Sequence, residues 1–113
     1  HHDKKADAPS GTGIRTAELI SNARQSRRSP DPTTSVKFDG ARGALVGDVS
    51  VHSIRLPGLV AHQTVLFGGE GEILTIRHDS LNRISFMAGV KLAIRRVRDI
   101  DGFVVGLDKL MAE

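Results

Sequence analysis

Near the beginning of the chain, apolar side chains recur at the three- and four-residue spacing of an amphipathic α-helix. The pattern predicts a helix from Ser10 to about Arg28, because Ser10 or Thr12 can cap the first turn. Pro30 and Pro32 then end it, since proline lacks the amide hydrogen that a continuing helix needs. The apolar face comprises Ile14, Ala17, Ile20 and Ala23, and the last turns carry Arg24, Arg27 and Arg28.

A stretch rich in Pro, Gly, Ser and Thr follows at residues 29–45, and a connection of this length is functional, packed at an interface, or mobile. Alternating apolar and polar residues then predict three strands: "VGDVSVHSIRL" at 46–56, "LVAHQTVLF" at 59–67 and "EILTIRH" at 72–78. The links "LPG" and "GGEGE" are short and contain glycine, so we expect antiparallel neighbours. Apolar residues occur on both faces of these strands, which calls for a second covering layer such as another subunit.

Helical periodicity returns from about Arg83 to Asp99, and "GLDKLMAE" predicts a short last helix. The order of helix, strands and helix predicts an α+β fold. We expect a mainly antiparallel or mixed sheet of about four strands, with helices on one face. The apolar stripe of the second helix comprises Phe86, Val90, Ala93, Ile94 and Val97.

Composition narrows the function classes. The 113 residues suit one domain, and the chain has no cysteine, which excludes disulfides and thiolate chemistry and fits a cytoplasmic protein. No apolar run approaches a membrane span, and no signal-peptide pattern is present, so we expect no membrane partner. The net charge of +3 favours an anionic partner, but the motifs of nucleic-acid binders are missing, so a small anion is expected instead.

The stretch "DAPSGTG" at residues 7–13 has the composition of an anion-binding helix start. Unpaired backbone amides, two hydroxyls and a glycine stand together at the positive end of the helix dipole. A carboxylate or a phosphate suits this geometry, and a plain N-cap explains the same residues. The spacing is not that of a P-loop.

The preceding "HHDKK" at residues 1–5 adds two histidines and two lysines. A histidine exchanges protons near neutral pH, so the pair supplies a proton donor beside the anion site. Three other interpretations stay open: the stub of a tag, a surface pair, or a metal site with Asp3 or Asp7. The metal site is disfavoured because adjacent side chains of a strand point to opposite faces.

Arg83 follows Asn82, a good N-cap, which places the arginine in the first turn of the second predicted helix. A cation there opposes the helix dipole, so an anion or an acidic neighbour is expected beside it. Two donor-rich helix starts suit a dicarboxylate. We find no motif for binding a hydride-donating dinucleotide in this sequence, because no Gly-x-Gly-x-x-Gly sequence follows a predicted strand.

The segment "HHDKKADAPSGTG" resembles the His-His-x-x-Lys-x-Asp-Ala-Pro-Ser-Gly-Thr-Ala signature of the 4-hydroxy-tetrahydrodipicolinate reductase family, also called dihydrodipicolinate reductase. The stretch from Val51 to Val90 is similar to the rest of that family's C-terminal domain. The resemblance implies that residues 1–113 form a substrate-binding and tetramerisation domain. It also implies a Rossmann domain for NADH or NADPH outside this chain, so that the chain alone is expected to be inactive.

The resemblance also implies site residues. His1 matches the family's proton donor and Lys5 its catalytic lysine. The substrate is a cyclic dicarboxylate of the diaminopimelate route to lysine, and the sheet between about Val46 and His78 forms a homotetramer. No metal is implied. The matching substrate-binding residues are His2, Lys5, Ser10, Gly11, Thr12 and Arg83.

A departure from the family's pattern and two alternative functions remain. Gly13 replaces the usual alanine, which should weaken the helix start by up to ~1 kcal/mol. The alternative function is a non-catalytic oligomerisation or anion-binding module with the same fold, and a zinc-binding module is a more distant one.

Overall fold

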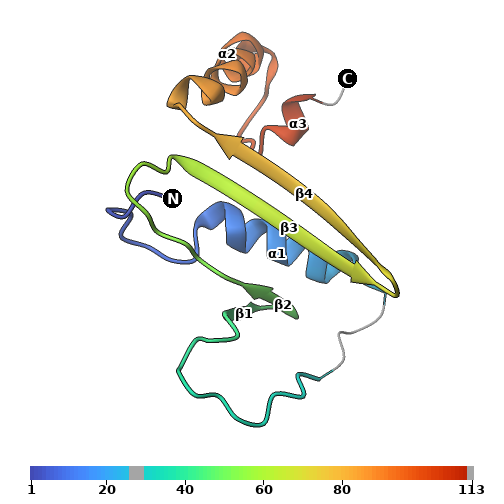
Figure 1. The fold of residues 1–113 in the computed structure, drawn as a ribbon. Coiled ribbons are helices and arrows are strands. Elements are labelled where there is room, and N and C mark those ends of the chain that lie inside the picture. The colour runs from blue at the N-terminus through green and yellow to red at the C-terminus, as the bar shows by residue number, and fades with distance from the viewer. Residues whose placement is uncertain (26–29, 112–113) are drawn as a thin grey trace. The chain divides into compact units, whose positions relative to one another are not determined.

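The computed structural model describes residues 1–25 and 30–111. The chain divides into two compact units, His1–Leu59 and Val60–Glu113, which we call the N-terminal and C-terminal units. The N-terminal unit contains α1 (Gly11–Ala23), β1 (Ala44–Val46) and β2 (Val49–Val51) (Figure 1). The C-terminal unit contains β3 (Ala61–Gly69), β4 (Glu72–Ser80), the 3-10 helix η1 (Arg83–Phe86), α2 (Met87–Arg96), η2 (Val97–Asp99) and α3 (Asp108–Met111).

Helix α1 begins as the sequence predicts and ends earlier. Ser10 is the N-cap, whereas the C-cap is Arg24, whose extended backbone terminates the helix after Ala23. The Arg24 guanidinium donates to the Asp48 carboxylate over 2.9 Å, so this arginine braces the turn between β1 and β2. The last predicted helical residues, Arg27 and Arg28, lie outside the described residues.

Strands β1 and β2 form a hairpin where the sequence suggested one continuous strand. Gly47 has φ of 60°, a left-handed conformation that permits the tight turn to Val49. Helix α1 packs on this hairpin, and the Ser21 hydroxyl accepts from the Asp48 amide over 3.3 Å. The prediction of a single strand at 46–56 is therefore wrong. The apolar residues alternate on both sides of Gly47, so their pattern does not reveal the turn.

Strands β3 and β4 form a long antiparallel hairpin in which Val65 faces Ile76 and Phe67 faces Leu74. Since side chains alternate across a strand, these four apolar residues share one face. The opposite face also carries apolar residues: Leu66 is 67% exposed and Ile73 is 73% exposed.

The opposite face also holds a charged cluster near the end of the hairpin. The Asp79 carboxylate binds His62 Nδ1 over 2.6 Å and accepts from Arg77 Nε over 2.9 Å. These hydrogen bonds, that of Arg77 foremost, lower the pKa of Asp79 below its ordinary value. The cluster joins β3 to β4, because His62 and Asp79 are direct cross-strand partners.

We expect Asp79→Asn to lower stability near neutral pH and to flatten its decline in acid. A carboxyl whose folded pKa is depressed contributes stability above its unfolded pKa, about 3.9, and that contribution is lost as pH falls through the folded pKa. The measurement is the thermal unfolding midpoint against pH, with Asp101→Asn as an exposed aspartate control. Parallel curves for the wild type and Asp79→Asn would contradict this prediction.

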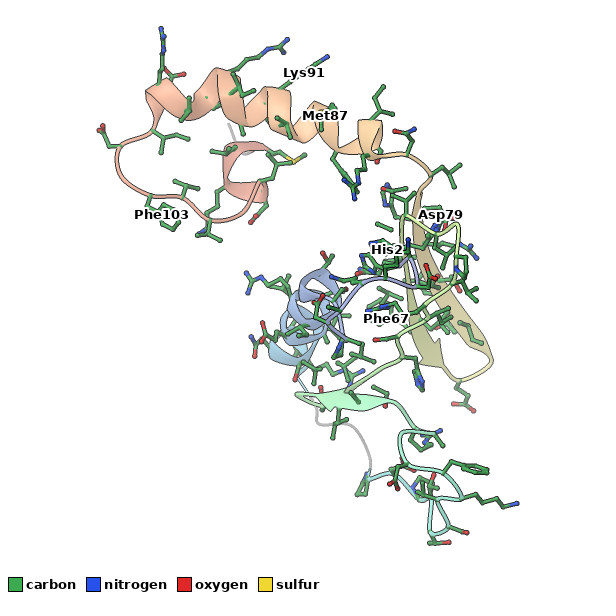
Figure 2. The ribbon with its side chains drawn as sticks, turned by 90° about the vertical axis from the view of Figure 1, so that its left-hand side faces the viewer. His2, Phe67, Asp79, Met87, Lys91 and Phe103 are labelled. Carbon is green, nitrogen blue, oxygen red and sulfur yellow. The ribbon has the colours of Figure 1, made fainter. Side chains whose placement is uncertain are left out.

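The predicted second helix is present as three consecutive elements, η1, α2 and η2, which together cover Arg83–Asp99. Leu107 packs against Gly89 of α2, where an added Cβ would lie 2.8 Å from a Leu107 methyl group. Figure 2 shows Met87 and Lys91 on α2, and Phe103 on the segment between η2 and α3. Phe103 is 90% exposed, and most of the apolar stripe on this helix is exposed as well.

The α+β class is confirmed, with four antiparallel strands among the described residues. In the described residues β1 pairs with β2 and β3 pairs with β4, so the strands form two two-stranded sheets and not the single sheet that the sequence predicted. In the described part of the chain only Ala17 and Ser80 are fully buried, so much apolar surface is left uncovered. No helix among the described residues has the length and apolar character needed to cross a membrane.

Candidate anion-binding site

The start of α1 has the geometry of an anion site. The Ser10 hydroxyl accepts from the Gly13 amide over 3.1 Å, and the Ser10 carbonyl accepts from Ile14 over 2.9 Å. The amides of Gly11 and Thr12 precede this first intrahelical bond, so they have no acceptor within the helix. No acidic side chain occupies the first turn, which leaves the positive end of the helix dipole uncompensated.

Space is open beside these amides. A Cβ added to Gly11 would meet no other atom within 4 Å, and both Gly11 and Thr12 are exposed. A flat anion can therefore approach the backbone closely at this position. The structure thus brings Ser10, Gly11 and Thr12 together in the way that the sequence predicted.

We expect Gly13→Ala to stabilise the N-terminal unit by up to about 1 kcal/mol, because alanine loses less backbone entropy in a helix. The added Cβ would lie 3.2 Å from Ser10 Oγ, a tight contact that a small shift of this short side chain relieves. Chemical denaturation measures the effect, with exposed Leu19→Ala as a helix-surface control. A loss of stability would mean that Gly13 is required by the cap.

The two histidines lie on a segment that pairs with a distant part of the chain. The backbone nitrogen of His1 donates to the Ile54 carbonyl over 3.1 Å, and the Leu56 amide donates to the His1 carbonyl over 3.2 Å. His1 and His2 are both half-buried, and Lys5 donates its amide to the His2 carbonyl over 3.3 Å. Residues 1–5 are therefore held in a defined conformation within the N-terminal unit.

Lys5 forms an ion pair that the sequence did not predict. Its Nζ donates to the Asp7 carboxylate over 2.6 Å, and the lysine side chain is 23% exposed. This hydrogen bond lowers the pKa of Asp7 below its ordinary value. The sequence suggested Asp7 only as a possible metal ligand, yet the spacing of two residues from Lys5 is a signal for this pair.

Metal ligation finds no support in the described residues. Over 1–25 and 30–111, no three His, Asp or Glu side chains gather in a group that could hold an ion.

Arg55 is the second residue that the sequence did not indicate. One of its terminal nitrogens donates to the Asp7 carbonyl over 2.9 Å, although 48 positions separate the two residues. A lone arginine in a predicted strand carries no signal of such a long-range contact.

Arg83 stands at the predicted helix start, in the C-terminal unit. The Asn82 side chain accepts from the Ile84 amide over 2.9 Å, which confirms the N-cap. The first turn is a 3-10 helix and not an α-helix. Since Arg83 belongs to a different unit from Ser10, its contribution to the site stays a prediction.

Comparison with known proteins identifies a family and several similar reductases. The family described as "Dihydrodipicolinate reductase, C-terminus" matches residues 1–111. The 4-hydroxy-tetrahydrodipicolinate reductases of Bacillus thuringiensis (strain Al Hakam) and Bacillus cereus (strain AH187) are similar, each 53% identical over 111 residues, which are 98% of this chain and 42% of the relative. A solved structure, the dipicolinate-bound dihydrodipicolinate reductase from Paenisporosarcina sp. TG-14, has a TM-score of 0.83 and 50% sequence identity, and the match covers 98% of this chain and 42% of that one.

The chain belongs to the family of dihydrodipicolinate reductase C-terminal domains. It spans about two fifths of the length of the curated relatives that it matches. The resemblance drawn from the signature at residues 1–13 is therefore confirmed.

Proposed function

We propose that this chain is the substrate-binding part of a reductase that converts 4-hydroxy-tetrahydrodipicolinate, a cyclic dicarboxylate, in lysine and diaminopimelate biosynthesis. The observation that carries the proposal is the open, acid-free start of α1, which lies a few residues after the ordered Lys5. The dipicolinate in the structure of the Paenisporosarcina relative is a flat cyclic dicarboxylate, similar in shape to the proposed substrate. Membership of the family supports the same reaction.

The proposed binding mode follows from the geometry of the helix start. One substrate carboxylate accepts from the amides of Gly11 and Thr12, and the Ser10 and Thr12 hydroxyls lie beside it. His2 and Arg83 complete the substrate contacts, and the fork of Arg83 suits a carboxylate in a bidentate grip. The amides of the helix start and the Arg83 guanidinium each take one carboxylate, so together they select a dicarboxylate over a monocarboxylate.

Proton transfer is assigned to the first segment. His1 donates the proton, because an imidazole exchanges protons near neutral pH. Lys5, oriented by Asp7, stabilises negative charge that develops on the substrate. NADH or NADPH supplies the hydride when bound, and we assign its binding to a separate Rossmann domain, because no Gly-x-Gly-x-x-Gly sequence follows a strand here.

We also propose a homotetramer assembled through the β3–β4 hairpin. Both of its faces carry exposed apolar residues, among them Leu66 and Ile73 on one face and Leu74 on the other. Exposed apolar surface of this kind marks an interface. Light scattering of the full-length reductase tests this assembly, and a monomer would contradict it.

The substrate partner is the cyclic dicarboxylate, and neither nucleic acid nor a membrane belongs to this proposal. The reaction is assigned to the cytoplasm, where the family's biosynthetic route operates.

The test of the proposed function is an assay of the full-length reductase with 4-hydroxy-tetrahydrodipicolinate and NADH or NADPH. The expected result is oxidation of the nicotinamide that depends on the substrate and is inhibited by dipicolinate. Dipicolinate binding without turnover would instead support a non-catalytic anion-binding module. The absence of both binding and turnover would refute both functions.

A further inference from the structure

The guanidinium of Arg55 connects two segments of the N-terminal unit that are far apart in the sequence. One terminal nitrogen donates to the Asp7 carbonyl over 2.9 Å, and the other donates to the Ile54 carbonyl, also over 2.9 Å. Asp7 is the residue whose carboxylate holds the Lys5 ammonium. A continuous chain of contacts therefore runs from Arg55 through Asp7 to Lys5.

The same segment also holds His1. Ile54 and Leu56, the two neighbours of Arg55, exchange backbone hydrogen bonds with His1 over 3.1 Å and 3.2 Å. The backbone of His1 and, through Arg55 and Asp7, the side chain of Lys5 are thus both held to residues 54–56. Within residues 54–56, it is the Arg55 side chain that donates a hydrogen bond to Asp7, the residue that pairs with Lys5.

The environment of Arg55 favours this fixed geometry. Arg55 is half-buried, and its Nε is buried without a hydrogen-bond partner among residues 1–25 and 30–111. An exposed arginine would solvate that nitrogen in water, so its burial indicates that packing holds the fork in one orientation. The planar fork reaches two carbonyls at once, which a lysine ammonium on a flexible stem does not reproduce.

We propose that Arg55 is a positioning residue that acts through Asp7 on the orientation of the Lys5 ammonium. The inference rests on the proposed function, in which Lys5 acts on the substrate. The family resemblance assigns no role to Arg55, so the assignment comes from these contacts alone. Arg55 is not expected to touch the substrate itself.

The test is a double-mutant cycle in the full-length reductase, with Arg55→Met, Lys5→Met and the double variant. We expect Arg55→Met to lower kcat by about tenfold to a hundredfold, because a small displacement of a catalytic group costs this much, while KM changes by less than about threefold. In the Lys5→Met background the same substitution should have almost no further effect on kcat, because the group that it positions is gone. Arg42→Met is the control, since the Arg42 guanidinium likewise donates a hydrogen bond, but to the Asp31 carboxylate, which is distant in sequence from Lys5 and Asp7.

The outcomes separate this inference from the proposed function. A wild-type enzyme that neither binds dipicolinate nor reduces the substrate refutes the proposed function. An active wild type in which Arg55→Met leaves kcat unchanged, or lowers kcat equally with and without Lys5, overturns only the role of Arg55.

A second variant keeps the test decisive if Arg55→Met does not fold. Asp7→Asn retains a side-chain oxygen beside Lys5 but loses the charge, and the contact chain predicts that its effect on kcat also disappears in the Lys5→Met background. Equal losses of kcat in the two backgrounds would overturn the inference.

Discussion

His1→Ala in the full-length reductase is expected to lower kcat by about 10²- to 10⁴-fold, the usual contribution of a positioned general acid. Affinity for dipicolinate should change little, because in the proposed binding mode the amides of Gly11 and Thr12, and not the imidazole, hold the carboxylate. The backbone bonds of His1 to Ile54 and Leu56 remain in the variant, so the segment keeps its place. Steady-state kinetics together with calorimetry measure the two quantities.

His52→Ala is the matched control for this prediction. His52 is an exposed histidine just after β2 and has no proposed contact with the substrate, so kcat should stay within about twofold of the wild type. An unchanged kcat in His1→Ala would contradict the assignment of His1 to proton transfer.

Arg83→Ala should weaken dipicolinate binding about ten- to a hundredfold. A hydrogen bond to a charged group contributes about 1.5–3 kcal/mol, and each 1.4 kcal/mol is a factor of ten in affinity. Because the Asn82 cap does not involve the Arg83 side chain, the helix start should survive the substitution. Isothermal titration calorimetry of the full-length protein gives the dissociation constants directly.

Arg95→Ala on α2 controls for the loss of one positive charge in the C-terminal unit. Equal affinities for the wild type and Arg83→Ala would show that the second carboxylate is held by some other group. Arg83→Lys should fall between the two, since an ammonium keeps the charge and loses the bidentate fork.

The sequence predicted correctly those features that depend on residues close together in the chain. The Ser10 and Asn82 caps follow from short polar side chains at helix starts, and the β3–β4 register follows from alternation of apolar residues. The split at Gly47 was missed, because the apolar alternation on its two sides runs on without interruption. The pairing of the strands into two sheets instead of one was missed, because a short link between strands does not ensure that they pair.

The candidate site shows the same division. Ser10 to Thr12 form a contiguous motif whose backbone geometry follows from the helix start, so the sequence predicted it well. Arg55 depends on a contact across 48 positions that no local pattern encodes. The Lys5–Asp7 pair lies between these cases, because its spacing is short but a surface pair of this kind is usually without a role.

The central claim is that the first amides of α1 hold a dicarboxylate. Titration of the isotopically labelled full-length protein with dipicolinate, followed through its amide resonances, tests this most directly. The account predicts that the amides of Gly11 and Thr12 show the largest shifts and saturate with the calorimetric dissociation constant. Saturating binding that leaves both resonances unmoved would contradict it.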